Sequence, residues 1–278
     1  MGSRSLTKTV RGSDAVDGAG VRLVRVLGHG TVTDFDPFLM LDAFDSRDPK
    51  DYVKGFPWHP HRGIETVTYL IEGRIEHGDS LGNSGTIGNG DCQWMTAGSG
   101  IIHQEMPKEA ERMLGLQLWL NLPAKDKMTG PKYRDITAAM VPKVEEDGTA
   151  VAVISGHFKG VEGAIQGDYV KTLMLDADIK PGGSLKVKVP QTDTLFFYVV
   201  RGSGTMEGGE ISAKSANLTS EGEVLDLNAG SEGLRAILFS GAPLKEPVAW
   251  GGPIVMNTRE ELDKAFSELR DGSFIRHR

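Results

Sequence analysis

The sequence is poor in cysteine and in long apolar segments. Cys92 is the only cysteine among 278 residues, so no disulfide can form within the chain and a reducing compartment is expected. No apolar run is long enough to span a bilayer, and the first residues lack the apolar core of a secretory signal. We therefore expect a cytoplasmic protein that does not bind membranes, with the nucleus as a second location in a eukaryotic cell.

Concentrated positive charge is also missing. The chain has 31 Lys and Arg residues against 38 Asp and Glu, a formal net charge of −7. The cations are scattered instead of forming a stripe that could neutralise successive phosphates, so direct binding of nucleic acid is not expected. The short basic segments 4–8 and 276–278 are interpreted as solvated termini.

What the chain does contain is typical of an all-β protein. There are 36 Gly and 13 Pro, and short apolar runs alternate with Gly, Asn and Asp clusters, as in sandwiches and barrels. A single helix is expected near the end, because Thr258 and Glu261 have capping-box spacing and Gly272 can end it. The predicted strands are 21–27, 65–71, 114–120, 150–154, 194–200 and 235–239.

The chain also resembles itself, which favours two domains of one design. Residues 65–73 (ETVTYLIEG) match 194–202 (TLFFYVVRG), and 90–105 match 222–237 at a nearly equal offset. The length fits two domains better than one core. We place the first at residues 1–135 and the second, ending in the helix, at 136–278.

Four residues of the first domain are candidate metal ligands. His59 and His61 are two apart, which in a strand puts both imidazoles on one face with Cβ atoms about 7 Å apart. His103 and Glu105 repeat this spacing, and an antiparallel neighbour would aim them into the same cavity. Pro60 cannot donate a ladder hydrogen bond, so its segment is expected at an edge or bulge.

The alternatives to metal binding are surface or packing roles, since one His-x-His pair is weak evidence. The repeat alignment favours metal binding. The equivalent positions in the second copy do not suit a metal, and histidines that only packed would more plausibly be replaced there by other packing residues than by a cation and a proline. Glu65 is interpreted as the hydrogen-bond acceptor for a ligating imidazole. No chemistry is assigned to the other histidines. The equivalent positions are Lys188, Pro190, Arg235 and Ile237, and the unassigned histidines are His29, His77, His157 and His277.

These motifs resemble those of the pirin family. The resemblance rests on residues 59–66 (HPHRGIET), 93–98 (QWMTAG) and 102–107 (IHQEMP), with 36–39 and 252–257 near the ends, so it covers nearly the whole chain. It implies two tandem cupin domains, which are jelly-roll β-barrels, and a short C-terminal helix. It also implies that the residues matching His59, His61, His103 and Glu105 hold one divalent metal ion, and that the second cupin holds none. Iron(II) is expected, with nickel, copper, manganese, cobalt or zinc as alternatives.

The expected chemistry follows from this ligand set. Three neutral imidazoles and a carboxylate leave a divalent ion with a net charge of about +1 and open positions. The resemblance implies a flavonol (quercetin) 2,3-dioxygenase, in which dioxygen opens the flavonol C ring and Glu105 serves as the base for the substrate hydroxyl. Phe56, Trp58 and Met106 either hold the flat substrate or pack the barrel.

Two other functions remain open at this point. One is a redox-sensing, iron-dependent accessory protein that binds a transcription factor or an enzyme, which the resemblance also permits. The other is an unrelated small-molecule enzyme on the same barrel, because one fold hosts many functions. A monomer is expected in each case.

Overall fold

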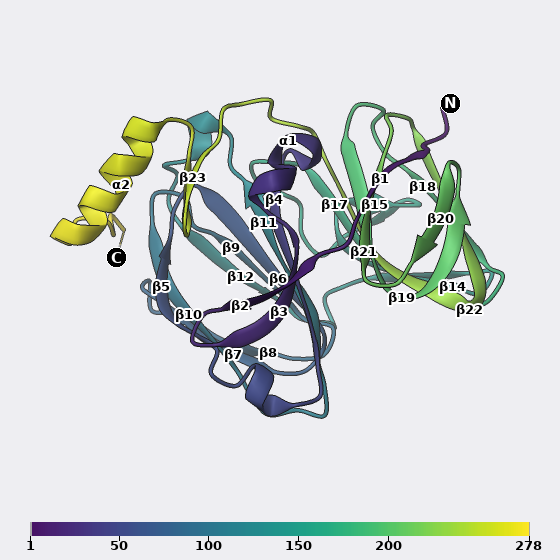
Figure 1. Ribbon diagram of the computed structural model, residues 1–278, viewed down its shortest axis with the longest axis horizontal. Helices are drawn as coiled ribbons and strands as arrows, with labels where there is room; N and C mark the ends of the chain where they lie inside the picture. Colours follow the sequence, from purple (N-terminus) through teal and green to yellow (C-terminus); the bar gives the residue numbers. More distant parts are fainter. Residues whose placement is uncertain (1, 278) are drawn as a thin grey trace. The chain divides into compact units, whose positions relative to one another are not determined.

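The computed structural model describes residues 2–277, and most of them lie in strands, as expected for an all-β chain (Figure 1). All of the predicted strands fall within observed ones. The chain divides into two compact units. We call the first the site unit: it comprises Ser13–Val32, Phe38–Ala138 and Leu244–Arg278. The second unit comprises Met1–Gly12, Thr33–Pro37 and Ala139–Pro243.

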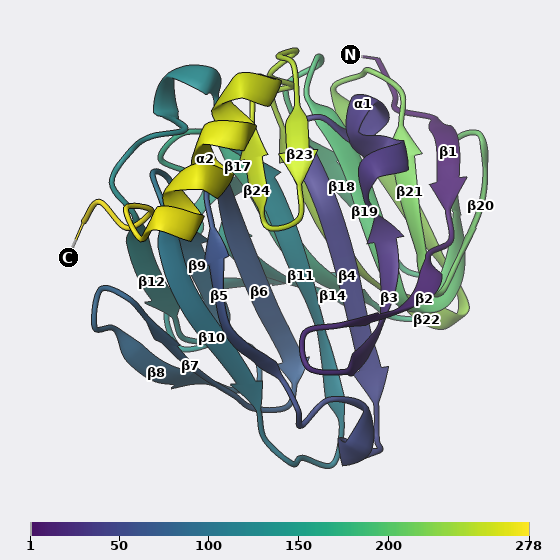
Figure 2. The ribbon, with the colours of Figure 1, turned by 60° about the vertical axis from the view of Figure 1, so that its left-hand side comes forward.

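The units interleave along the chain, which differs from the expected single boundary between residues 135 and 136. The N-terminal strand β1 (Leu6–Val10) pairs with β21 (Ser215–Thr219) of the second unit. The C-terminal helix α2 (Arg259–Asp271) belongs to the site unit (Figure 2). Its Leu262 and Ala265 pack with Ile254, Met256 and Phe274. Both ends of the chain therefore fold against the half that is distant in sequence.

The site unit contains a seven-stranded and a four-stranded antiparallel sheet. The larger has the order β12-β9-β6-β11-β4-β3-β2 and the smaller the order β5-β10-β7-β8. The larger sheet comprises β2 (Ser13–Asp17), β3 (Val21–Leu27), β4 (Phe38–Ser46), β6 (Ile64–Glu72), β9 (Cys92–Thr96), β11 (Met113–Asn121) and β12 (Lys132–Ile136). The smaller comprises β5 (Phe56–His61), β7 (Ile75–Asp79), β8 (Ser84–Ile87) and β10 (Ile101–Pro107).

Short elements complete the site unit. Strands β23 (Ala249–Gly251) and β24 (Ile254–Met256) pair with each other just before α2. The predicted capping box of α2 is confirmed, since the Thr258 hydroxyl accepts from the backbone N–H of Glu261, and Gly272 ends the helix at φ 80°. None of the described helices is long and apolar enough to cross a bilayer. The remaining helices of the site unit are η1 (His29–Thr31), η2 (Pro49–Asp51) and η3 (Ala124–Asp126), whereas α1 (Val32–Phe35) lies almost entirely in a segment of the second unit.

The second unit repeats this strand order. Its sheet runs β1-β21-β19-β22-β17-β14-β13, with β18 paired to β22 and β20 to β19. Here β19 and β22 are each long enough to cover the positions of two strands of the site unit. The bounds are β13 (Lys143–Glu146), β14 (Thr149–Ser155), β17 (Thr172–Ile179), β18 (Ser184–Lys188), β19 (Thr194–Met206), β20 (Gly209–Ser212) and β22 (Val224–Gly241), with a separate hairpin of β15 (His157–Phe158) and β16 (Val161–Glu162).

The matching strand orders support duplication but correct part of the repeat alignment. Strand β6 corresponds to β19, as the first match predicts, but the counterpart of β9 is β21 and not residues 224–228. The second match was therefore wrong. Residues 224–228 of β22 pair with β18 as β10 pairs with β5, so they correspond to β10.

This register identifies new counterparts for the four candidate ligands. The first match makes Gly204 the counterpart of Ile75. Since Ile75 pairs with Pro107 and Gly204 pairs with Ala229, Ala229 is the counterpart of Pro107. Counting back along both strands, Leu227 is then the counterpart of Glu105 and Leu225 that of His103. Leu225 in turn pairs with Val187, the counterpart of His59. These residues replace the set aligned from the sequence, Lys188, Pro190, Arg235 and Ile237. The counterparts Val187, Val189, Leu225 and Leu227 are all buried and carry no metal-binding atom.

The N-terminal basic segment is only partly solvated, which corrects the expectation for residues 4–8. Arg4 is 1% exposed. Its guanidinium donates to the backbone oxygens of Gly222, Ser220 and Pro190, among other acceptors. Because a buried guanidinium needs its donors satisfied, Arg4 fastens the start of the chain to the second unit.

Candidate metal centre

Three of the four predicted ligands come together inside the site unit. Strand β5 carries His59 and His61, and β10 carries His103 directly opposite His59. The ligand atoms of the three histidines lie within 4.8 Å of one another. Pro60 lies in β5, which is the edge strand of its sheet, as its missing N–H predicts. The donor set could hold one metal ion, and its role as a set of ligands stays a prediction.

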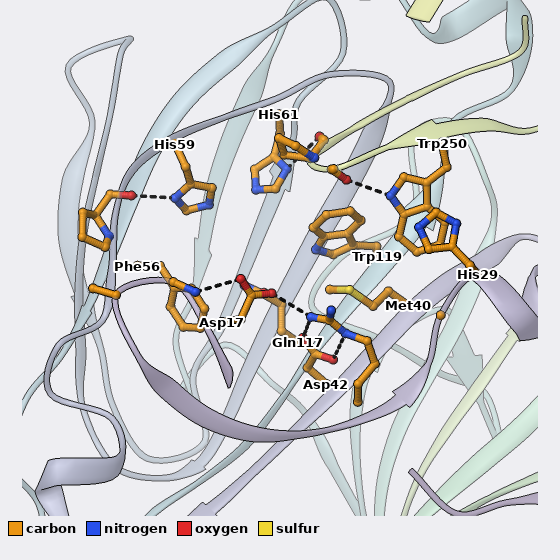
Figure 3. Close-up of a pocket in the computed structure, with 17 residues that line it drawn as sticks. Asp17, His29, Met40, Asp42, Phe56, His59, His61, Gln117, Trp119 and Trp250 are labelled. Atoms are coloured by element: carbon orange, nitrogen blue, oxygen red, sulfur yellow. Dashed lines mark hydrogen bonds and ion pairs between the residues drawn. The ribbon is translucent and has the colours of Figure 1, made fainter. Parts of the chain in front are cut away.

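Backbone carbonyls orient two of the rings. Nδ1 of His59 pairs with the Pro57 oxygen at 2.8 Å, and Nδ1 of His61 with the Pro253 oxygen at 3.1 Å (Figure 3). Because a carbonyl only accepts, each Nδ1 carries the proton and each Nε2 keeps its lone pair for a metal. The acceptors in these two bonds are therefore backbone oxygens and not the expected Glu65, whose carboxylate accepts from the Thr96 hydroxyl.

His103 supplies the test of whether a metal fits. It is 1% exposed, and neither of its ring nitrogens has a hydrogen-bond partner within the described residues. Buried polar atoms are rarely left unpaired, because each costs free energy when removed from water. A metal ion between the three rings would satisfy a His103 nitrogen, so the residues present fit such an ion.

Burial keeps the imidazoles in the form that binds metals. Burial, together with a smaller effect of the nearby His59, lowers the pKa of His61 to about 3. Burial also lowers the pKa of His103 well below 6.5, with His61 and His59 adding to the effect. Since only a neutral imidazole offers a lone pair, both rings are ready to coordinate at neutral pH.

These pKa shifts predict acid lability of the metal-free protein. Below pH 6.5 these two histidines are protonated in the unfolded chain, whereas His61 and His103 of the folded protein stay neutral. The free energy of unfolding therefore falls as pH falls from 6.5 towards 3. We expect His61 to contribute a loss of about 2 kcal/mol at pH 5, with a further loss from His103. Urea unfolding at pH 7.5 and 5 measures it, and equal stability at the two values would contradict it.

Glu105 lies on the same inward face of β10 as His103 but outside the three-histidine group. It is 2% exposed. Its Oε1 accepts from the Thr68 hydroxyl at 2.9 Å and its Oε2 from the Gln117 amide at 2.7 Å. The pairing register of β10 with β5 shifts between His103 and Glu105, so the two side chains do not continue one regular ladder. Glu105 is thus a buried, oriented carboxylate beside the cluster.

A cavity of about 520 Å³ opens beside the histidines and is lined by His59 and His61 (Figure 3). Aromatic rings line it one after another. The Trp119 ring is edge-on to the His61 ring with 5.0 Å between ring centroids, and the Trp250 and Trp119 ring centroids are 5.7 Å apart. His29, which was assigned no chemistry, stacks on Trp250 at 3.9 Å. The cavity is large enough for a drug-sized ligand.

Sequence reasoning found only part of this lining. Of the three residues considered for substrate binding or barrel packing, Phe56 lines the cavity. Trp58 and Met106 do not line it: Trp58 is 55% exposed, and Met106 lines a separate surface hollow. Trp119 lies in a predicted strand, but no pattern in the sequence indicates the direction of its side chain. Trp250 could not be found, because it reaches the cavity only through the fold of the C-terminal segment.

Charged groups form the opposite wall of the cavity. Arg25 pairs with the buried Asp42 at 2.8 Å and with the half-exposed Asp17 at 2.8 Å (Figure 3). These two carboxylates raise the pKa of Arg25, chiefly through the Asp42 hydrogen bond. With one cation against two anions, this wall favours neutral or hydrogen-bond-donating ligands over further anions.

Comparisons with known proteins agree with these features. Residues 20–120 match the family model described as Pirin, and residues 174–275 match the Pirin C-terminal cupin domain. A Pseudomonas aeruginosa protein named "Putative quercetin 2,3-dioxygenase PA3240" is 46% identical over 280 residues, 97% of each chain, and human Pirin is 38% identical over 97% of this chain and 93% of its own. The crystal structure of quercetin 2,3-dioxygenase from Acinetobacter baumannii superposes with a TM-score of 0.89 at 31% identity, covering 98% of both chains.

Proposed function

The chain belongs to the pirin family, with two cupin domains, and from this premise we propose that it is a metal-dependent quercetin 2,3-dioxygenase. The reaction opens the flavonol C ring with dioxygen and releases carbon monoxide. The observation that carries the proposal is the cluster of His59, His61 and His103, two of which, His59 and His61, line an aromatic cavity. The similarity to a protein and a structure named as quercetin 2,3-dioxygenases supports it.

The three imidazoles would hold one divalent ion, with Glu105 as the proposed fourth ligand and iron(II) as the expected metal. When bound, the ion supplies Lewis acidity that makes the substrate's 3-hydroxyl easier to deprotonate and gives dioxygen a place to react. Nitrogen and oxygen ligands without sulfur suit iron, nickel, copper, manganese, cobalt and zinc, and so do not select among them.

The chain's own residues account for substrate binding. Trp119 and Trp250 offer flat apolar faces for an aromatic substrate, and Met40 and Phe56 also line the cavity. A cavity of about 520 Å³ suits a molecule of three fused or linked rings. The position of His61 at the cavity wall, edge-on to Trp119, brings a stacked ligand next to the imidazole cluster.

Glu105 is the proposed base. The Thr68 hydroxyl and the Gln117 amide each donate to one of its oxygens, which fixes the plane of the carboxylate. Gln117 also lines the cavity, so its hydrogen bond to Glu105 links the carboxylate to the space where a substrate would bind. In this role Glu105 would accept the proton of the substrate's 3-hydroxyl at a carboxylate oxygen.

The direct test is an assay of the iron-loaded protein with quercetin. We expect substrate loss with matching release of carbon monoxide in air, and no loss under nitrogen or after removal of the metal by a chelator. Metal-free protein serves as the control for non-enzymatic oxidation. Absence of metal-dependent quercetin loss would overturn the proposed activity.

A second candidate is the iron-dependent redox sensor that binds a protein partner. The observation that favours it is Trp58, which neighbours His59 and is 55% exposed, since exposed tryptophans are enriched at interfaces. In this role the oxidation state of the iron would change partner affinity. A partner whose capture changes with iron oxidation and is lost on Trp58→Ala, in a protein without turnover, would support it.

A further inference from the structure

A buried lysine is hydrogen-bonded to the turn that follows the histidine-bearing strand β5. Lys127 is 1% exposed, and its ammonium donates to the Gly63 oxygen at 2.8 Å, the Asn121 Oδ1 at 2.6 Å and the Val255 oxygen at 3.0 Å. An ammonium has three N–H groups, so this geometry uses all of them. All three acceptors are neutral, although a buried cation is usually paired with a carboxylate.

We propose that Lys127 is a positioning residue for the metal centre: it ties the backbone that follows His61 to β24 and so holds the Pro253 carbonyl against the His61 imidazole. This inference rests on the proposed metal site and assigns a role in it to a residue that touches neither metal nor substrate. Its three acceptors come from three parts of the site unit that are distant in sequence.

The first of these parts is the turn between β5 and β6. Gly63 follows the His59-Pro60-His61-Arg62 segment at φ 78°. The backbone N–H of Val255 donates to the Arg62 oxygen at 3.1 Å. A Cβ at Gly63 would lie 1.9 Å from the Val255 oxygen, so β24 packs directly on the turn. Lys127 donates to the carbonyl oxygens of both Gly63 and Val255, and so links the turn to β24.

The second part is the C-terminal segment itself. Pro253 immediately precedes β24 and supplies the acceptor that orients the His61 ring. Because residue 253 is 192 positions from His61, this bond depends entirely on how the segment docks. Lys127 fixes the docking two residues from Pro253, close enough to control where that carbonyl points.

Arg62 provides a second anchor for the same docking. Its guanidinium donates to the backbone oxygens of Ser99 and Phe274, and pairs with Glu268 of α2 at 2.7 Å. It thus links the residue after His61 to the start of β10 and to the C-terminal helix. Lys127 and Arg62 together hold both ligand-bearing strands to the C-terminal segment.

The energetic cost of Lys127 argues against a purely structural role. Burial lowers the pKa of Lys127 to about 7, because the charged form loses its hydration. A hydrophobic residue of similar volume would avoid that cost. Groups that orient ligating histidines are usually worth about 10- to 100-fold in metal affinity, which would offset it.

The test compares Lys127→Met with Arg4→Met. Arg4 is equally buried and also donates to backbone carbonyls, but it lies in the second unit, so Arg4→Met controls for loss of stability alone. We expect Lys127→Met to weaken binding of cobalt(II) by about 10- to 100-fold and to change its visible spectrum. Arg4→Met is expected to lower stability in urea while leaving cobalt affinity and spectrum as in the wild type.

Asn121→Ala keeps the test decisive if Lys127→Met does not fold. This variant removes one of three acceptors, and we expect a smaller weakening of cobalt binding with a spectral change in the same direction. Unchanged affinity and spectrum in the folded variants would overturn the positioning role. If the wild-type protein itself binds no cobalt, the proposed metal site fails as well, so the two failures are distinguishable.

Discussion

Replacement of His103 by alanine is expected to remove the metal from the purified protein and to abolish flavonol turnover. His103 is fully buried between His59 and His61, and its nitrogens have no protein partner among the described residues to compete with an ion. Losing one of three imidazoles removes a large share of the coordination energy, so we expect metal affinity to drop by more than about 100-fold. Elemental analysis of the variant, with a circular-dichroism melt to confirm folding, measures it.

His157→Ala is the matched control, because His157 is exposed and lies in the β15–β16 hairpin of the second unit. Its metal content and turnover should equal those of the wild type. A folded His103→Ala protein with full metal content would contradict the account of the site.

Glu105→Gln is expected to retain a metal ion but lose turnover by about 100-fold or more. The glutamine amide can keep bonds to Thr68 and Gln117 by rotating, yet it cannot accept the substrate proton. General bases contribute about 10² to 10⁴ in rate. The measurement is kcat for quercetin loss together with metal content, which separates loss of the base from loss of the ion.

Glu76→Gln serves as the control for Glu105→Gln, because Glu76 lies on the neighbouring β7 and pairs with Lys108 away from the histidines. Turnover should be unchanged in this variant. Were Glu105→Gln to turn over quercetin at the wild-type rate with its metal in place, Glu105 would not be the base.

The histidine cluster could be predicted from the sequence because it depends on local rules. Two residues in alternate strand positions face the same side, and two such pairs meet when their strands are antiparallel neighbours, as β5 and β10 are. Glu105 shows the limit of this rule. The register shift between His103 and Glu105 has no sequence signature, so the sequence alone does not indicate that Glu105 stands outside the histidine group.

The repeat shows a similar limit. Residues 65–73 and 194–202 align correctly because a strand and its terminal glycine are kept in both units. The second match relied on the sequence Ala-Gly-Ser, which occurs in both segments although their strands are not counterparts in the two sheets. Only hydrogen-bond pairing reveals that Leu225 and Val187 are the counterparts of His103 and His59.

Contacts between distant segments were beyond sequence reasoning. The Pro253 carbonyl orients His61, yet any residue offers a carbonyl, so nothing in the sequence marks it. Lysine and arginine are usually exposed, but Lys127 and Arg4 are both buried because backbone oxygens from remote segments accept hydrogen bonds from them.

X-ray absorption spectroscopy of the metal-loaded protein tests the central claim most directly, since it counts the atoms bound to the ion. We predict one ion per chain bound to three imidazole nitrogens and a carboxylate oxygen. A spectrum with fewer than three imidazole nitrogens in the wild-type protein, or an unchanged spectrum from a His103→Ala protein that keeps its metal, would contradict the proposed centre.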